Sequence, residues 1–451
     1  MTFASSRPLR VAVVGTGVSG LAAAWLLARQ HEVTVYESAS RLGGHSHTVD
    51  APDGRGLVPV DTGFIVYNEP TYPNLTALLA HLGVGTVASD MSFGVSLDHG
   101  AFEYSSNSVA SYLRHPEVLA NPRFWAVIRE VVRFYRTGPR QMRALVSEGL
   151  SLGQFLDRCG YDPAFQRDHL LPQAAAIWSC SVHEIRDYPA AAFVAFCDSH
   201  GLMRFADRPR WRTVAGGSRA YVARMAEAFA GRLKLGCGVT SIRRARDDVL
   251  VRDASGGIER FDQVVVAAHA DQALRMLEAP TAQEQALLGA FRYSPNLAVL
   301  HSDVRMMPRR RAWWSAWNYL GRSGEHAEAT VTYWMNKLQR FDSREPLFVT
   351  LNPPAKMALK GEVAREAFEH PIFDGAAMAA QRRLWSLQGA NNTWFCGAWF
   401  GAGFHEDGLQ AGLAVAEQLG GVRRPWSVAD ESARIFLGPP ASAPRRTELA
   451  A

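Results

Sequence analysis

Three glycines near the start of the chain have the spacing of a loop that binds the phosphates of a dinucleotide. Gly15, Gly17 and Gly20 form the pattern G-x-G-x-x-G, and Glu37 ends the next apolar run. The first glycine permits a tight turn, the second lets the backbone approach a pyrophosphate, and the third lets a helix pack closely on a strand. The Glu37 carboxylate is suited to accept hydrogen bonds from ribose hydroxyls and would repel a 2′-phosphate. These residues predict a site for NAD or FAD rather than NADP.

The segments around these glycines have the composition needed to hold them in place. Residues 9–14 form a β-branched run suited to a buried parallel strand, residues 21–29 favour a helix, and residues 33–36 predict a second strand. The start of the helix, at Val18 and Ser19, offers unpaired N–H groups and the positive end of the helix dipole to phosphates. This order of strand, glycine loop, helix, strand and acid is that of a Rossmann unit.

A second motif distinguishes FAD from NAD. Arg41 and the pair Gly43–Gly44 follow Glu37 at the spacing E-x-x-x-R-x-G-G. An arginine at this place can neutralise a pyrophosphate, and paired glycines allow the backbone to contact the middle of the cofactor. The motif resembles the second signature of the flavin amine oxidase superfamily, which includes monoamine oxidases, protoporphyrinogen oxidases and phytoene desaturases.

The resemblance implies an α/β fold with two intertwined domains, in agreement with a length of 451 residues that exceeds what one hydrophobic core usually organises. A Rossmann-type FAD-binding domain of the glutathione-reductase and amine-oxidase kind is interleaved with an α+β substrate domain. The expected bounds are 8–70, 206–274 and 391–425 for the FAD-binding domain, 71–205 and 275–390 for the substrate domain, and 438–451 for a disordered tail rich in Pro, Ala and Arg.

The same resemblance extends to later parts of the FAD-binding domain. Residues 261–268 are expected to return to the sheet as a strand, and the backbone of Val239 is expected to meet the adenine. A strand at 394–396 leads to Gly397 and to a helix from about Leu409, whose dipole stabilises negative charge on the reduced flavin in relatives. The later residues predicted to bind FAD are Thr62, Gly63, Val239, Gly397, Gly408 and Leu409.

The chain departs from the superfamily pattern at several positions. His45 stands where many relatives have arginine; it could contact flavin or phosphate, carry a covalent bond to the flavin, or line the cofactor tunnel as a polar residue. Glu406 matches the glutamate of the amine oxidase pattern E-G-A-x-x-S-G, whereas Asp407 and Ala411 depart from it. Ala398 stands where many flavoproteins have an acid. These departures do not change the prediction that the chain binds the cofactor, but the identity of the substrate cannot be transferred from the relatives.

The region from about 9 to 425 resembles a bacterial branch described as predicted NAD/FAD-binding or FAD-dependent oxidoreductase proteins. The stretches that carry this resemblance are 61–68, 177–179, 317–319, 333–336 and 403–408. Such proteins are associated with modified fatty acid metabolism, alongside methyltransferases of the cyclopropane-synthase kind. The resemblance therefore implies a hydrophobic, fatty acyl substrate that is desaturated or isomerised by hydride transfer to flavin N5.

Four residues are candidates for acid–base chemistry beside a flavin: His405, Glu406, Tyr67 and Tyr333. Histidine titrates near neutrality, whereas Glu406 would need a pKa raised by burial before it could donate a proton. His405 and Glu406 could alternatively position the flavin or its loop.

Two other functions remain open. A flavin amine oxidase needs an aromatic cage for a neutral amine, and Trp399 and Phe404 could contribute to one. The chain could also be a flavin-binding partner protein that supports a lipid methyltransferase without turning over a substrate of its own.

Composition excludes some classes of function. The 48 Lys and Arg against 43 Asp and Glu give a net charge of +5, too small a bias to indicate binding to nucleic acid. Histidine and cysteine spacing predicts no metal site, and the five cysteines lack a C-x-x-C pair and indicate free thiols in a reducing cytosol. No apolar run reaches transmembrane length, so a cytoplasmic location is expected.

Two segments could place the protein peripherally on the inner face of a membrane. The helical segment 124–136 has a broad apolar face beside a narrow stripe with Arg129, Arg133 and Glu130, which suits burial in protein or contact with a lipid interface. The basic cluster 305–311 contains two methionines and could meet lipid headgroups or form an exposed loop.

Overall fold

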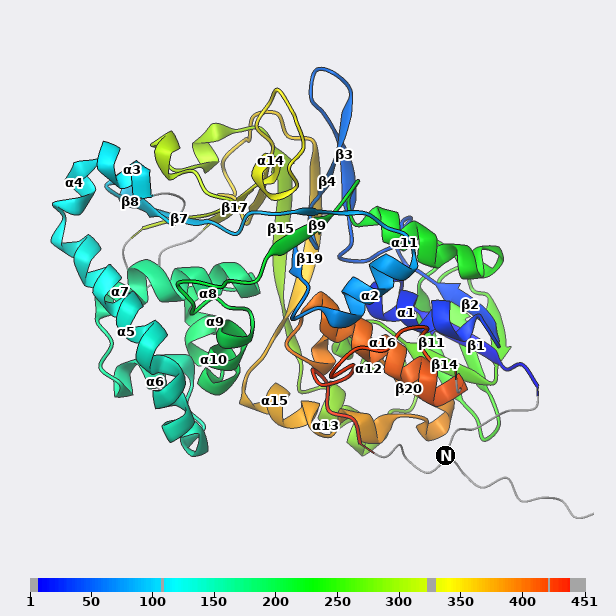
Figure 1. Ribbon diagram of the computed structural model, residues 1–451. Coiled ribbons are helices and arrows are strands. Elements are labelled where there is room, and N and C mark those ends of the chain that lie inside the picture. Colours follow the sequence, from blue (N-terminus) through cyan, green and yellow to red (C-terminus); the bar gives the residue numbers. More distant parts are fainter. Residues whose placement is uncertain (1–6, 107–108, 323–329, 421, 439–451) are drawn as a thin grey trace, which may run out of the picture.

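A computed structural model describes residues 7–106, 109–322, 330–420 and 422–438 of the chain. Most of the predicted tail at 438–451 lies outside the described residues. In Figure 1 a helical group occupies one end of the molecule, a large sheet stands in the middle, and a parallel sheet with covering helices occupies the other end.

The parallel sheet contains the Rossmann unit predicted from the first motif. Its strand order is β10-β2-β1-β14-β20, and every neighbouring pair is parallel. In β1 and β2 every residue after the first is buried, as expected for a parallel sheet covered on both faces. The strands are β1 (Arg10–Val14), β2 (Glu32–Tyr36), β10 (Leu233–Lys234), β14 (Gln263–Val266) and β20 (Thr393–Phe395).

Two helices, α1 (Val18–Leu27) and α16 (His405–Gly420), pack against each other beside this sheet. A Cβ atom on Gly412 would lie 2.1 Å from the carbonyl oxygen of Ser19, so this glycine permits the close crossing of the two helices. Through this contact the last helix of the described chain lies beside the first glycine loop.

The start of α16 differs from the prediction. The sequence predicts this helix from about Leu409, but it begins at His405, so Gly408 and Leu409 lie inside it. An Asp407 carboxylate oxygen accepts the N–H of Phe404 at 2.7 Å, and two acids stand in the first turn, where they are favourable beside the positive end of the helix dipole. Residues 261–268 also differ: Phe261 ends β13 (Ile258–Phe261), and the parallel strand begins only at Gln263.

The central sheet has seven strands in the order β19-β15-β18-β17-β16-β7-β8. All neighbouring pairs are antiparallel except β16 and β7, which are parallel. Its strands are β7 (Phe93–Leu97), β8 (Phe102–Ser105), β15 (Arg292–His301), β16 (Trp317–Gly321), β17 (Thr330–Trp334), β18 (Phe348–Leu351) and β19 (Ala364–Ile372).

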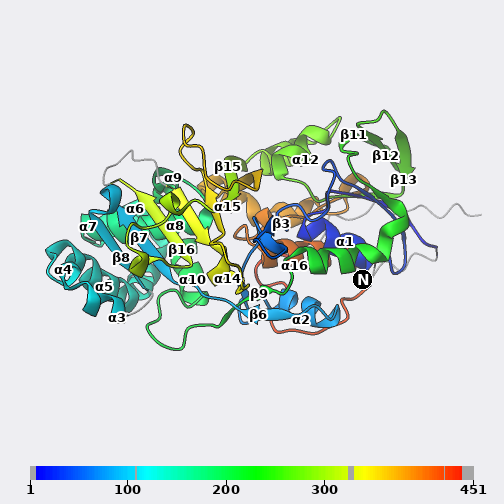
Figure 2. The same ribbon diagram turned by 90° about the horizontal axis from the view of Figure 1, so that it is seen from above.

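A group of helices lies beside β7 and β16 (Figure 2). Its longest member, α5, buries Phe124, Val127, Phe134 and Met142 and leaves Trp125 53% exposed. The group comprises α3 (Val109–Arg114), α4 (Pro116–Leu119), α5 (Pro122–Leu145), α6 (Leu152–Arg158), α7 (Pro163–Phe165), α8 (Leu171–Trp178), α9 (Val182–Asp187) and α10 (Ala190–Ser199).

Smaller elements complete the arrangement. Among the described residues there are also two three-stranded antiparallel sheets, β11-β12-β13 and β5-β9-β6, and the β3–β4 hairpin, which projects from the molecule in Figure 1. These strands are β3 (Thr48–Pro52), β4 (Leu57–Asp61), β5 (Tyr67–Asn68), β6 (Thr86–Ala88), β9 (Trp211–Val214), β11 (Val239–Arg244), β12 (Val249–Asp253) and β13. The remaining helices are α2 (Pro73–His81), α11 (Arg219–Ala226), α12 (Ala270–Met276), α13 (Ala282–Leu288), α14 (Met335–Leu338) and α15 (Gly375–Gln381).

This arrangement confirms the predicted class, an α/β fold with a Rossmann-type domain and an interleaved α+β domain. All strands of the parallel sheet come from the three segments expected to form the FAD-binding domain, and all strands of the central sheet come from the other two. β6 lies in a segment predicted for the substrate domain and β9 in a segment predicted for the FAD-binding domain, yet the two strands pair with each other. The domain bounds therefore stay a prediction.

The two segments considered for membrane contact bury part of their side chains in the protein, and membrane contact itself stays a prediction. Met306 and Met307 are buried, so the apolar side chains of the basic cluster face the core. In α5, Glu130 is buried and accepts a hydrogen bond from Arg133, which agrees with the alternative of a helix buried in protein. Within the described ranges, no helix combines the length and the apolar composition needed to span a bilayer.

Candidate functional site

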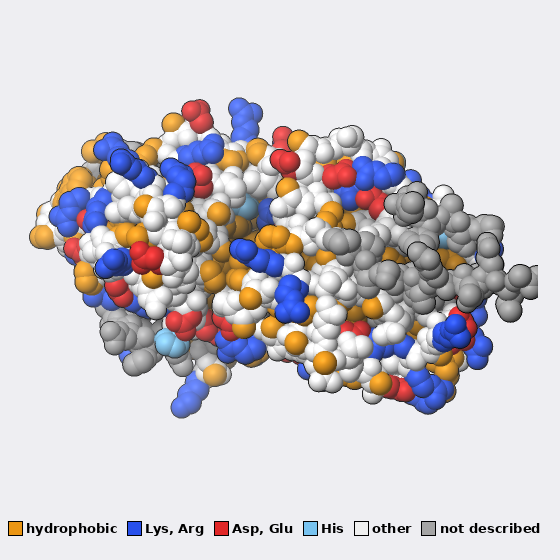
Figure 3. All heavy atoms as spheres, turned by 90° about the horizontal axis from the view of Figure 1, so that it is seen from below, with side chains coloured by type: hydrophobic (Ala, Val, Ile, Leu, Met, Phe, Trp, Pro, Cys, Tyr) orange, Lys and Arg blue, Asp and Glu red, His pale blue; other side chains and the backbone are white. Residues whose placement is uncertain are grey.

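A cavity of about 490 Å³ runs from the glycine loops of the parallel sheet to the central sheet and the helical group. Viewed from below, the surface is hollowed between the two ends of the molecule, and hydrophobic side chains gather in the hollow (Figure 3). The cavity thus joins the predicted cofactor-binding residues to the predicted substrate domain, and its two ends have different chemistry.

The first glycine loop has the geometry that a pyrophosphate requires. Gly15 has φ +98°, and a Cβ atom on Gly20 would lie 2.0 Å from the Gly15 carbonyl oxygen, so both positions exclude a side chain. A Cβ atom on Gly17, by contrast, would meet no atom within 4 Å. The loop therefore leaves open space at the start of α1, where Val18 and Ser19 also line the cavity.

Glu37 lies beside this loop at the end of β2. Its Oε2 atom accepts the Thr16 N–H at 2.9 Å, and its Oε1 atom accepts the Ala39 N–H at 2.9 Å. Glu37 lines the cavity together with Gly238 and Val239, as expected for the adenosine end of a dinucleotide site.

Arg41 has a different environment from the predicted one. Its guanidinium donates to the Gly44 carbonyl at 2.8 Å and forms an ion pair with Glu366, and Arg41 does not line the cavity. Gly43 and Gly44 do line it, and both have positive φ. Arg41 thus holds the paired-glycine loop in place, and its contact with a pyrophosphate stays a prediction.

The other predicted cofactor residues divide into two groups. Thr62, Gly63, Val239 and Gly397 line the cavity, whereas Gly20, Gly408 and Leu409 lie behind its wall. A Cβ atom on Gly63 would lie 2.1 Å from the His45 carbonyl oxygen, so this glycine lets the two segments pair closely. A Cβ atom on Gly408 would lie 2.9 Å from a methyl carbon of Val18, which places Gly408 in the contact between α16 and α1.

His45 lines the cavity among other aromatic rings. Its ring centre lies 4.8 Å from that of Phe368 and 5.2 Å from that of His370. Burial, followed by the charges of His370 and His269, lowers the pKa of His45 well below its usual range, so the ring is neutral at pH 7. Its Nε2 atom is buried and has no hydrogen-bond partner among the described residues, which suits contact with a ligand.

The four acid–base candidates do not come together. His405 and Tyr333 line the cavity, whereas Tyr67 and Glu406 do not. The His405 ring stacks on Phe64 at 3.8 Å between ring centres, and its Nε2 atom lies 2.6 Å from the Tyr221 hydroxyl. Burial lowers the pKa of His405 to about 3. Burial raises the pKa of Tyr333, so its hydroxyl keeps its proton at neutral pH.

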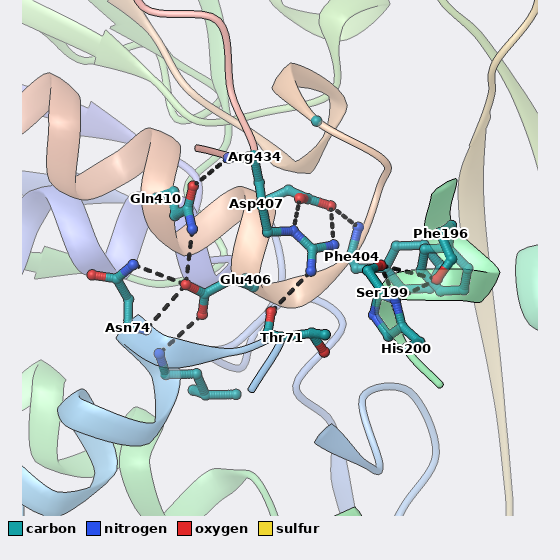
Figure 4. Close-up of polar contacts among 12 residues, drawn as sticks. Thr71, Asn74, Phe196, Ser199, His200, Phe404, Glu406, Asp407, Gln410 and Arg434 are labelled. Carbon is teal, nitrogen blue, oxygen red and sulfur yellow. Dashed lines mark hydrogen bonds and ion pairs between the residues drawn. The ribbon is translucent and has the colours of Figure 1, made fainter. Parts of the chain in front are cut away.

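Glu406 instead joins α16 to α2. Its carboxylate accepts the N–H groups of Asn74 and Leu75, each at 3.0 Å, and the side-chain amide of Gln410 (Figure 4). Burial raises the pKa of Glu406, while these hydrogen bonds oppose the shift. A carboxylate so fully engaged holds the start of α2 against α16, which favours the positioning role considered from the sequence.

Sequence reasoning missed Arg434. Its guanidinium binds the fully buried Asp407 carboxylate, with Nε to Oδ1 at 2.5 Å, and donates to the Thr71 carbonyl at 2.9 Å (Figure 4). Because Asp407 also accepts the N–H of Phe404, the ion pair fixes a residue that lines the cavity. Arg434 lies in a C-terminal segment without a motif, and only the departure at Asp407 could have signalled a buried acid in need of a cation.

The end of the cavity near the central sheet is apolar. Gln173 and Ser179 are polar exceptions among side chains that include Phe93, Ile177, Trp178, Trp317, Leu351 and Phe404. In the described part of the chain, no lysine or arginine lines the cavity, and its only lining carboxylates are Glu37 and Glu369. Trp178, Trp317 and Tyr333, which lie in the segments predicted for the substrate domain, are in the cavity wall, whereas Trp313 and Phe134 belong to the protein core.

Comparisons with known proteins agree with this geometry. AofH of Mycobacterium tuberculosis, described as a putative flavin-containing monoamine oxidase, is 28% identical over 258 residues, which are 55% of this chain and 54% of that protein. The chain therefore spans about half the length of this curated relative.

Solved structures share the fold over nearly the whole chain. A putrescine oxidase variant has a TM-score of 0.67 at 16% identity and covers 92% of this chain and 99% of its own. The CLA-producing fatty acid isomerase from P. acnes has a TM-score of 0.64 at 16% identity and covers 91% of this chain and 98% of its own.

The family model described as "Flavin containing amine oxidoreductase" matches residues 18–303. This match covers more than half of the chain and includes the second glycine motif and the helix that follows the first. The chain therefore belongs to the family of flavin-containing amine oxidoreductases, and FAD is its cofactor.

Proposed function

We propose that the protein is an FAD-dependent oxidoreductase that desaturates a fatty acyl chain or moves a double bond within it. One observation carries the proposal: the end of the cavity beyond the cofactor-binding loops is mostly apolar and aromatic, and among the described residues no lysine or arginine lines the cavity. An apolar chain gains free energy by leaving water for such a surface, about 0.8 kcal/mol for each buried methylene. The similar fold of a fatty acid isomerase supports this substrate class.

FAD supplies a two-electron acceptor that can take a hydride at N5. The chain's own residues hold and enclose the substrate. Aromatic side chains, among them Trp178, Trp317 and Phe404, exclude water from the space beside the cofactor. Desaturation also removes a proton. His405 lines the cavity, but burial lowers its pKa to about 3, so its neutral ring is a weak proton acceptor and we assign the base of this step to no residue.

Tyr333 lines the cavity with a hydroxyl that keeps its proton at neutral pH and can donate a hydrogen bond, because burial raises its pKa. Isomerisation needs a proton or hydride to leave one carbon and return to another. Glu406 and Tyr67 belong to the supporting structure in this proposal, because neither lines the cavity.

The amine oxidase alternative has less support from the site. Within the described residues, the ring contacts of Trp399 are with Phe291 and Phe400, and its Nε1 atom donates to the Ala268 carbonyl. Phe404 lines the cavity, as Trp399 does, but it stacks on Phe196, and among the described residues the rings of Trp399 and Phe404 are not in contact with each other. Membrane contact and a methyltransferase partner, both considered from the sequence, have no observation in their favour.

Anaerobic mixing of the FAD-loaded protein with single compounds tests the proposal. An oleoyl compound should bleach the flavin absorbance if the reaction is desaturation, or leave the flavin oxidised while the double bond moves if it is isomerisation. Bleaching by benzylamine or putrescine, with no change in any acyl compound, would identify an amine oxidase. Unchanged acyl compounds and amines, with stable capture of a lipid methyltransferase, would favour the partner-protein function.

A further inference from the structure

An acyl substrate carries an anionic head, which the cavity itself is not built to receive. A free fatty acid ends in a carboxylate, and an acyl chain in a phospholipid is attached to a phosphate. Among the described residues the cavity wall has no lysine or arginine, and burial lowers the pKa of the lining histidines His45, His370 and His405. A carboxylate or phosphate inside would therefore be buried without a counter-ion, at a cost of several kcal/mol. The head must stay at an edge of the cavity.

One edge of the cavity is formed by the connection between α10 and β9. Leu202 and Trp211 line the cavity, and residues 204–208 and 210 between them are exposed. In Figure 2 this connection loops out beside α10 before it reaches β9. We call residues 204–210 the arginine segment because Arg204, Arg208 and Arg210 lie in it, and all three are exposed.

These arginines have no carboxylate partners within ion-pair distance among the described residues. Arg208 Nε donates to the Arg204 carbonyl at 2.5 Å, which folds the segment on itself, and the Arg208 guanidinium also interacts with the Tyr135 hydroxyl. Asp207 is the only acid in the arginine segment, so the three arginines leave the segment with a net positive charge. This differs from many other exposed arginines of the chain, such as Arg219, which pairs with Asp50.

The same segment also presents an apolar surface. Phe205 is 60% exposed, and its ring lies 5.0 Å from that of Tyr135 on α5. A cationic group beside an exposed aromatic ring, between two chain positions that line an apolar cavity, matches a ligand with an anionic head and a hydrophobic tail.

Building on the proposed function, we propose that the arginine segment binds the carboxylate or phosphate of the acyl substrate, while the chain passes Leu202 and Trp211 into the cavity. Guanidinium groups form paired, charge-assisted hydrogen bonds with both kinds of oxyanion. The cavity then selects substrates by their apolar chain, and the arginine segment selects them by the charge of their head group.

The test compares three probes on the FAD-loaded protein, with binding followed by the change in flavin absorbance. The probes are oleate, methyl oleate and vesicles of dioleoyl phosphatidylglycerol. The variant R204Q/R208Q/R210Q should weaken oleate binding at least about tenfold, as expected for the loss of charge-assisted hydrogen bonds. Binding of methyl oleate should change less than about twofold, because the ester has no charge to lose.

A matched control removes the same number of charges elsewhere. Arg243, Arg246 and Arg252 are exposed on or beside β11 and β12, in the small sheet beside the parallel sheet. The variant R243Q/R246Q/R252Q should bind oleate as the unaltered protein does, which separates a local contact from a general effect of net charge.

The outcomes distinguish a free fatty acid from a phospholipid as the source of the anionic head. They also distinguish failure of the head site from failure of the proposed function. Loss of oleate binding alone assigns the arginine segment to a free carboxylate, and loss of vesicle binding alone assigns it to a lipid phosphate. Equal binding of all probes by the unaltered and R204Q/R208Q/R210Q proteins overturns the head site while the proposed function stands. If the unaltered protein binds no acyl probe, the proposed function itself fails.

Discussion

At the scale of single residues, the cofactor site depends on where a side chain is absent. Gly17 is the position with open space in front of it, whereas Gly15 and Gly20 are constrained by neighbouring backbone. The spacing of these glycines is visible in the sequence because each has a separate backbone task. Their different surroundings are not visible there, since they depend on contacts with residues such as Ala267, far along the chain.

A Gly17→Trp substitution should abolish retention of FAD. The indole would occupy the open space at the start of α1, where the pyrophosphate is expected, and we expect FAD affinity to fall at least about a hundredfold through steric exclusion and loss of the phosphate contacts. The characteristic visible absorbance of oxidised flavin in the purified protein measures this. Gly56, in the β3–β4 turn, also has no atom within 4 Å of an added Cβ, so Gly56→Trp is the control and should stay yellow. A yellow Gly17→Trp protein would refute the assigned path of the cofactor.

The Arg434–Asp407 ion pair should contribute strongly to stability. Removal of one partner from a buried pair leaves an uncompensated charge, which costs about 3–5 kcal/mol. Arg434→Gln should therefore lower the free energy of unfolding by about that amount, because Asp407 is fully buried. Urea unfolding measures the change.

Arg423→Gln is the control for this prediction. Arg423 pairs with Glu417 and Glu431, but its side chain is 59% exposed, so its removal should cost at most about 1 kcal/mol. Equal losses in the two variants would show that the buried network of Figure 4 is not what holds the first turn of α16.

At the scale of elements, sequence patterns predict strands and helices that are continuous in the chain. β1, α1 and β2 lie where the apolar run, the Ala-rich segment and the second run indicate. The sequence places the start of α16 too late because glycines and polar residues at 401–408 resemble a loop. Its early start depends on the side chain of Asp407 and on contact with the C-terminal segment, and neither appears in local composition.

The acid–base candidates show the same difference between what local sequence predicts and what depends on tertiary contacts. His405 and Glu406 are neighbours in the sequence, but successive residues of a helix point in different directions, so one lines the cavity and the other faces α2. The motif identifies both residues but not the direction of either side chain.

The crossing of α1 and α16 should depend on Gly412. A methyl group at this position would overlap the Ser19 carbonyl, and relief of the overlap would move the helices apart. Gly412→Ala should lower the free energy of unfolding by roughly 1–3 kcal/mol despite the better helix propensity of alanine. Gly375→Ala, at the start of α15 with no atom within 4 Å of an added Cβ, is the control and should be neutral or stabilising. Thermal unfolding that ranks the two variants in the opposite order would contradict this packing.

At the scale of the whole molecule, many histidines are buried in neutral form. Burial is the largest cause of a lowered pKa for each of them, and the affected residues include His169, His200, His301, His370 and His405, with pKa values of about 3 to 4. The unfolded chain takes up protons at these sites near pH 6.5, whereas the folded protein does not until the pH is much lower. Stability from these groups is therefore present above pH 6.5 and lost as the pH falls toward 4.

Asp61 acts in the opposite direction. Burial raises its pKa to about 6, so this group stabilises the fold as the pH falls from 6 toward its unfolded value of 3.8. Because several histidines oppose it, the free energy of unfolding of the FAD-loaded protein should drop by at least about 3 kcal/mol between pH 7 and pH 5. Urea unfolding at the two pH values measures the difference, and equal stability at both would mean that the histidines are protonated in the folded state.

The central claim is that an acyl chain lies in the apolar end of the cavity against FAD and is changed there. The most direct measurement is mass spectrometry of the acyl chains after anaerobic incubation of an oleoyl substrate with a stoichiometric amount of the FAD-loaded protein. We expect either a chain lighter by two hydrogens, with an equal amount of reduced flavin, or a chain of the same mass with its double bond at a new position. Recovery of unchanged oleoyl chains from protein shown to have bound them would contradict it.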